Sequence, residues 1–86
     1  MTKHPSAQKR HRQSVKRETR NHAIRSRVRT FVRRVRESIA AGKADEASDL
    51  LRVASRALDK AVTKGVIHRN TAARKKSALA RRLATA

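Results

Sequence analysis

The fold is decided by residues 24–39, which have the sequence IRSRVRTFVRRVRESI. Apolar side chains recur there every three or four residues, the spacing that places them on one face of an α-helix. This face comprises Ile24, Val28, Phe31, Val32, Val35 and Ile39. An apolar face among so many arginines predicts an amphipathic helix that buries one side against other elements.

The same helix face changes character toward the N-terminus. Continued backwards at helical spacing, it meets Asn21, Arg17, Ser14 and Arg10. These polar and charged side chains do not form a core. The apolar face therefore stops near Ile24.

The first helix is predicted to extend well beyond the core that it helps to form. It should begin near Pro5 or Ser6, because proline is favoured in a first helical turn. It should end just before Gly42, because a glycine in the left-handed conformation commonly terminates a helix. About 36 residues at roughly 1.5 Å each would span about 54 Å. A globular chain of this length has a radius of gyration of only about 12 Å. Residues 1–23 must then project as an arm, which is expected to be frayed or disordered until a polyanion neutralises it.

A second helix is predicted from about Asp45 to Lys64, ending at Gly65. Good helix formers dominate this stretch, and its acidic start and basic end suit the helix dipole. One face of it is apolar and comprises Ala47, Leu50, Leu51, Ala54, Leu58, Ala61 and Val62.

A third helix is predicted after residues 66–67, with His68 or Asn70 as its N-cap and an end near Leu83. Ala72, Leu79 and Leu83 form a thin apolar line along it. Both connections between helices are only a few residues long, so consecutive helices should pack as antiparallel neighbours.

Together these features predict an all-α fold, an antiparallel three-helix bundle with a long first helix whose N-terminal half projects as a basic arm. No alternating run rich in valine, isoleucine or threonine indicates a strand. We expect a single domain over residues 1–86, made of the arm (residues 1–23) and the bundle (residues 24–86).

The charge of the chain is large and unevenly placed. Lysine and arginine number 24 against 6 acidic residues, a formal net charge of +18. Residues 1–36 carry 13 basic and 1 acidic side chains, residues 37–65 carry 5 of each, and residues 66–86 carry 6 basic and none acidic. This distribution predicts that the first and third helices face a polyanion and that the second is mainly a packing partner.

Several functional classes are excluded by composition. Cysteine, tryptophan and tyrosine are absent, so disulfides, thiol catalysis and cysteine-ligated zinc are ruled out. His11 and His22 share a helix face but lie roughly 16 Å apart along it, too far for one metal ion. No glycine-rich phosphate loop or nucleophile motif is present. We therefore predict no enzymatic activity, no metal, no cofactor and no small-molecule substrate.

A membrane role is not favoured either. No uninterrupted apolar run exceeds three residues, and the N-terminus lacks the apolar stretch of a secretory signal, so a cytoplasmic location is expected. Residues 24–39 alone would also suit a membrane-surface peptide or a calmodulin-like groove. Matching apolar faces on the other two helices make a core the simpler interpretation.

Nucleic acid is the expected partner. Arginine outnumbers lysine 16 to 8, and a guanidinium grips phosphate through two parallel hydrogen bonds. The only aromatic residue, Phe31, belongs to the apolar face, which leaves no platform for stacking single-stranded bases. Gly65 interrupts the heptads that a zipper-type DNA binder would need. Recognition of shape and phosphates in structured nucleic acid remains, and charge alone does not distinguish RNA from DNA.

Two groups of motifs carry a family resemblance. The first comprises SAQKR at residues 6–10, RQSVKR at 12–17, RN at 20–21 and RTF at 29–31. The second comprises KGVIHRN at 64–70 and AARKKS at 72–77. In order and spacing, the chain resembles the bacterial small-subunit ribosomal protein S-twenty family over nearly its whole length.

The resemblance implies a ribosome-bound structural constituent of the small (30S) subunit that binds 16S ribosomal RNA directly and early in assembly. From the charge of the first and third helices we expect phosphate and ribose contacts that bridge separate RNA helices, and we expect few protein contacts. The alternative is a histone-like DNA-coating protein. The RNA-binding residues carried over are Lys9, Arg10, Arg12, Gln13, Ser14, Lys16, Arg17, Arg20, Asn21, His68, Arg69, Asn70, Arg74, Lys75 and Lys76. The basic character of the first helix adds Arg27 and Arg34.

Overall fold

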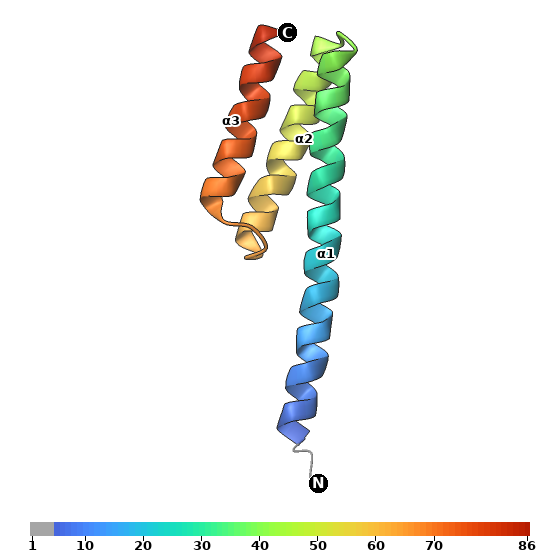
Figure 1. Cartoon of the computed structure of the whole chain (residues 1–86), viewed down its shortest axis with the longest axis vertical. Helices are drawn as coiled ribbons and strands as arrows, with labels where there is room; N and C mark the ends of the chain where they lie inside the picture. Colours follow the sequence, from blue (N-terminus) through green and yellow to red (C-terminus); the bar gives the residue numbers. More distant parts are fainter. Residues whose placement is uncertain (1–4) are drawn as a thin grey trace.

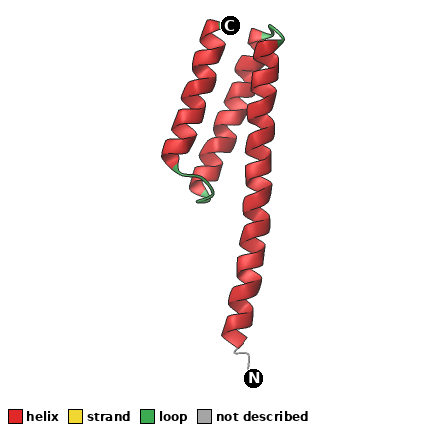
Figure 2. Ribbon diagram, viewed as in Figure 1, coloured by secondary structure: helices red, strands yellow, loops and turns green. Residues whose placement is uncertain are grey.

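The computed structural model describes residues 5–86, so the first four residues of the predicted arm lie outside it. Within that range the chain forms three α-helices and no strand, α1 (Pro5–Ala40), α2 (Ala44–Thr63) and α3 (Arg69–Thr85). Consecutive helices run antiparallel, as Figures 1 and 2 show. The predicted all-α, three-helix fold is confirmed, and α3 continues two residues past the predicted end at Leu83.

The turn between α1 and α2 depends on a left-handed glycine. Gly42 has a φ of +73° and donates its amide hydrogen to the Ile39 carbonyl at 3.1 Å. The Lys43 amide bonds the Ser38 carbonyl at 3.0 Å. This pair of bonds satisfies carbonyl groups that a helix end otherwise leaves unpaired, and it reverses the chain sharply.

The turn between α2 and α3 uses the same device and adds a side-chain cap. Gly65 has a φ of +72°, and the Val66 amide bonds the Ala61 carbonyl at 2.9 Å. His68 is the N-cap of α3, since its imidazole Nδ1 accepts the Asn70 backbone N–H at 3.1 Å. Of the two predicted caps, His68 is therefore the one used.

The core is small and built largely from alanine and valine. The largest fully buried side chains are Leu58, Leu79 and Val35, one from each helix. Alanine at the remaining α2 and α3 positions lets the helix backbones approach closely. α1 packs mainly on α2 and α2 on α3, while α1 touches α3 least. The buried cluster comprises Val28, Val32, Val35, Ala54, Leu58, Ala61, Ala72 and Leu79.

The N-terminal half of α1 projects beyond the bundle, as predicted (Figure 1). Residues 7–20 are all exposed, and Ile24 is the first apolar residue packed against the core. The molecule measures 62 × 21 × 15 Å, and its radius of gyration is 17.5 Å. That value exceeds the roughly 12 Å of a globule of this length because the arm has nothing to pack against.

Candidate nucleic-acid interface

The arm concentrates positive charge on a helix surrounded by solvent. Six cations lie between residues 7 and 20 with Glu18 as the only acid, and all of these residues are exposed. They are Lys9, Arg10, Arg12, Lys16, Arg17 and Arg20. Because α1 is one uninterrupted helix, the faces of the arm can be followed from the packed part of α1 by residue spacing alone.

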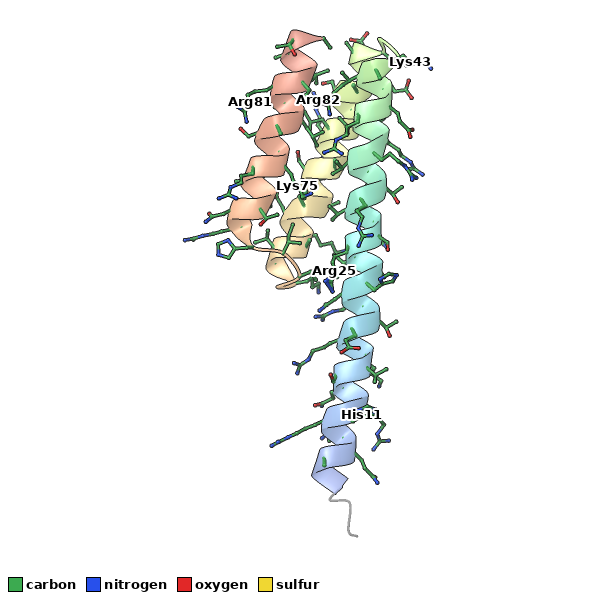
Figure 3. All side chains as sticks on the ribbon, in the orientation of Figure 1. His11, Arg25, Lys43, Lys75, Arg81 and Arg82 are labelled. Atoms are coloured by element: carbon green, nitrogen blue, oxygen red, sulfur yellow. The ribbon has the colours of Figure 1, made fainter. Side chains whose placement is uncertain are left out.

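One side of the arm, the inner face, continues the line of buried core residues. It consists of Arg10, Ser14, Arg17 and Asn21, spaced four, three and four residues apart in line with Ile24. The inner face therefore looks toward the space beyond the ends of α2 and α3. Figure 3 shows nitrogen-tipped side chains of the arm reaching to the side on which those helices lie.

A second row of cations, the flank, runs along the whole of α1. Its members recur at intervals of three, four or seven residues, so they line up along one side of the helix. Gln13 lies between the flank and the inner face. The flank comprises Lys9, Arg12, Lys16, Arg20, Arg27 and Arg34, all of them exposed.

Among residues 7–23, the remaining side of the arm, the outer face, carries no lysine or arginine. It consists of His11, Val15, Glu18 and His22, spaced four, three and four residues apart. Val15 is 47% exposed, one of two large apolar side chains so open to solvent among the described residues. Positive charge on the arm is thus confined to two of its three sides. Beyond the arm, the side of α1 that continues the outer face carries basic residues, beginning with Arg25.

The inner face ends at a polar group without a partner. Asn21 is half-buried where the arm meets the bundle, and its Oδ1 is buried with no hydrogen-bond partner. An unsatisfied buried acceptor costs about 1–3 kcal/mol. Because this oxygen is buried, a ligand at Asn21 would meet the side-chain amide nitrogen and not Oδ1.

The beginning of α3 adds cations at the bundle end nearest the arm. His68, Arg69 and Asn70 are exposed there, beside the α2–α3 connection (Figure 1). Since Nδ1 of His68 accepts the Asn70 N–H, the neutral imidazole carries its proton on Nε2. That N–H remains available as a donor to an external acceptor.

Further cations continue along α3 in two rows. Arg74 and Lys75 are exposed. Arg81 follows Arg74 by seven residues and Arg82 follows Lys75 by seven, so each pair lies on one side of the helix. Figure 3 labels Lys75, Arg81 and Arg82 on this helix. The site prediction omitted Arg81 and Arg82, although the seven-residue spacing was available in the sequence.

Lys76 stands apart from the other predicted site residues. It is half-buried, and its Nζ lies 2.7 Å from Oδ1 of Asp59 on α2. Within residues 5–86, the only other ion pairs are Arg33–Glu37 at 3.7 Å and Lys43–Glu46 at 3.9 Å. Nearly all cations of the arm and of α3 are therefore uncompensated within the described protein.

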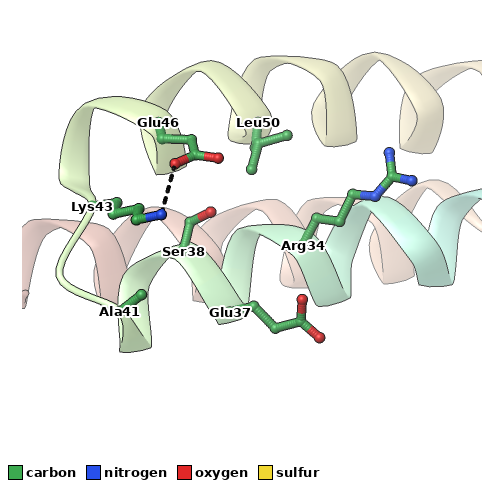
Figure 4. Close-up of a pocket in the computed structure, with 7 residues that line it drawn as sticks. All are labelled: Arg34, Glu37, Ser38, Ala41, Lys43, Glu46 and Leu50. Atoms are coloured by element: carbon green, nitrogen blue, oxygen red, sulfur yellow. Dashed lines mark ion pairs between the residues drawn. The ribbon is translucent and has the colours of Figure 1, made fainter.

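A shallow pocket lies at the opposite end of the bundle, at the α1–α2 turn (Figure 4). It mixes two cations with two carboxylates around an apolar wall, so it lacks the one-signed charge of the arm. Its lining comprises Arg34, Glu37, Ser38, Ala41, Lys43, Glu46 and Leu50. Among residues 5–86, no three histidine or acidic side chains gather as a metal ion requires. Over the same residues, no helix is both long and apolar enough to cross a membrane.

Comparisons with known proteins place this arrangement in context. The family model described as Ribosomal protein S20 matches residues 2–84. A Beutenbergia cavernae protein named Small ribosomal subunit protein bS20 is 56% identical over 75 residues, which cover 87% of this chain and 87% of the relative. Proteins of the same name from Mycobacterium leprae and Dinoroseobacter shibae are 52% and 49% identical over 83 residues, which cover 96% of this chain and 96% and 94% of the relatives.

Proposed function

Because this chain belongs to the Ribosomal protein S20 family, we propose that it binds 16S ribosomal RNA directly and bridges separate RNA helices as the small subunit assembles. Membership of the family makes it a non-enzymatic, structural constituent of the small ribosomal subunit. We place it on cytoplasmic ribosomes, with few contacts to other proteins.

One observation carries the proposal: two strongly cationic segments, with Glu18 as their single acid, lie on either side of an electrically balanced segment. Residues 1–36 and 66–86 hold all of the excess positive charge, while residues 37–65 are neutral overall. A merely solvated basic surface would have acids scattered through all three helices. The separation instead supports contact with polyanion at two places on the molecule.

The proposed contacts are mainly to phosphate and ribose. Arginine suits phosphate because its planar fork forms two parallel hydrogen bonds, and short polar side chains among the arginines suit ribose. The half-buried position of Phe31 supports double-helical rather than single-stranded RNA as the target. The proposed RNA-binding residues are Lys9, Arg10, Arg12, Gln13, Ser14, Lys16, Arg17, Arg20, Asn21, Arg27, Arg34, His68, Arg69, Asn70, Arg74 and Lys75, and Lys76 joins them where its pair with Asp59 opens.

A competition experiment tests this function. The full chain is bound to a labelled 16S ribosomal RNA transcript at near-physiological salt and challenged with unlabelled transcript or with a DNA duplex of equal phosphate content. We expect the transcript to compete far better than the duplex. Equal competition across salt concentrations would favour a histone-like DNA-coating protein instead.

A further inference from the structure

The short polar side chains of the arm differ in whether the helix itself uses them. Beside the outer face, the Thr19 hydroxyl donates to the Val15 carbonyl at 3.0 Å and is occupied by the helix itself. On the inner face, the Ser14 hydroxyl forms no hydrogen bond within the described residues, and Oδ1 of Asn21 is buried without a partner. Ser14 and Asn21 therefore keep hydrogen-bonding groups that the helix does not use, on the side that faces the space beyond the bundle.

The order of side chains along the inner face matches a particular target. Arg10 and Arg17 are long cations, and the short polar side chains of Ser14 and Asn21 follow each of them by four residues. The four residues extend over roughly 16 Å of helix. The minor groove of A-form RNA is wide and shallow, is bordered by phosphates, and displays 2′-hydroxyl groups. Long cations suit its phosphates, and short polar groups suit its 2′-hydroxyls.

The end of the bundle places further hydrogen-bond donors beside the inner face. The α2–α3 connection lies at the end of the bundle from which the arm projects (Figure 1), and His68 and Arg69 are exposed beside it. The Nε2–H of His68 is available there, because Nδ1 is already used by the helix cap. An RNA helix lying along the inner face would therefore meet further donors at the bundle end.

We propose that the inner face is the surface by which this protein distinguishes RNA from DNA. It lies along the minor groove of one double-helical RNA segment, with Arg10 and Arg17 on phosphates and with Ser14 and Asn21 on 2′-hydroxyls. DNA lacks the hydroxyl, so it loses these contacts. The flank holds a second RNA segment through charge alone. This inference rests on the proposed function and assigns different roles to two sides of one helix.

The test uses the full chain and a 16S ribosomal RNA transcript in which 2′-deoxynucleotides are incorporated sparsely at random positions. Bound and unbound transcripts are separated, and the positions at which a deoxynucleotide weakens binding are mapped. For the natural chain we expect a small set of such positions on both strands of one RNA helix. Ser14→Ala and Asn21→Ala should each erase some of them and weaken binding roughly three- to tenfold, the effect of one lost hydrogen bond.

Thr19→Ala is the matched control, since it removes a hydroxyl that the structure already occupies. It should leave the deoxynucleotide map unchanged. Circular dichroism of the RNA-bound forms checks that each variant reaches the helicity of the natural chain, and Ser14 is exposed enough that its loss leaves packing intact. Suppose that the natural chain prefers 16S RNA to DNA, but Ser14→Ala and Asn21→Ala give the same deoxynucleotide map as the natural chain. That result would overturn this inference and leave the proposed function standing. Failure to prefer 16S RNA would overturn the proposed function itself.

Discussion

The Lys76 ammonium donates a hydrogen bond to the Asp59 carboxylate at 2.7 Å, across the interface between α3 and α2. The two side chains are 37% and 61% exposed, so solvent screens their attraction, and the pair contributes at most about 1 kcal/mol to stability. A further consequence concerns RNA binding. Lys76 is the cation of α3 that already has a partner within the protein, whereas Arg74 and Lys75 form no ion pair among the described residues.

Asp59→Asn is expected to release Lys76 toward RNA. The log–log slope of affinity against salt should steepen by about 0.7 to 0.9, the effect of one additional phosphate contact, while stability falls by less than about 1 kcal/mol. Salt titrations of binding and thermal unfolding measure the two quantities. Asp49→Asn is the control, because it makes the same charge change at an exposed α2 position that forms no ion pair in the described protein. Equal slopes for the two variants would mean that only net charge matters.

Replacing Arg10, Arg17 and Arg20 together with alanine should flatten the salt dependence of RNA binding. Each lost phosphate contact removes roughly 0.7 to 0.9 from the log–log slope, so the triple variant should lose about two to three. Replacing the three uncharged outer-face residues instead, as His11→Ala, Val15→Ala and His22→Ala, should leave the slope as it is. An unchanged slope in the arginine variant would remove the arm from the interface.

The free protein should be only marginally stable, with a largely unfolded arm. Its core depends on alanine, a few branched residues and a half-buried Phe31, and the arm is a cationic helix without packing partners. We expect helicity at 222 nm to be low in the free protein and to rise when 16S RNA binds. Full and cooperative helicity of the free chain at low salt would contradict this.

His68 is expected to have two separable roles, as helix cap and as RNA contact. His68→Ala removes the acceptor for the Asn70 N–H and should cost about 1 kcal/mol of stability as well as weakening binding. His68→Asp restores the cap but removes the Nε2–H donor and adds negative charge. It should fold as well as the natural chain and bind RNA more weakly. If both variants bind RNA as the natural chain does, His68 serves only the helix.

Some features of the site were predictable because they follow from spacing along one helix. The arm projects because the apolar face stops at Ile24 while helix formers continue, and no tertiary contact is needed for that conclusion. The glycine positions likewise determine where the chain reverses, since Gly42 and Gly65 both adopt left-handed φ values. The row from Arg74 to Arg81 also follows from residue spacing, since seven residues separate these two cations on one helix.

Other features depend on packing between helices and could not be predicted. Lys76 belongs to the same basic run as Lys75, and only the docking of α3 on α2 brings it to Asp59, 17 residues earlier. The burial of Oδ1 of Asn21 likewise does not follow from spacing along α1. Phe31 lies on the apolar face yet is half-buried, and the Arg34 guanidinium lies 5.7 Å from its ring centroid.

The amino-acid sequence by itself determined three helices, a protruding cationic half of α1 and a nearly neutral α2, because helix periodicity and charge are local properties of the chain. Tertiary packing decided which cations remain uncompensated and which side of the arm looks into the space beyond the bundle. Those outcomes depend on distances between residues far apart in the chain, and such distances arise only when the apolar faces of all three helices meet.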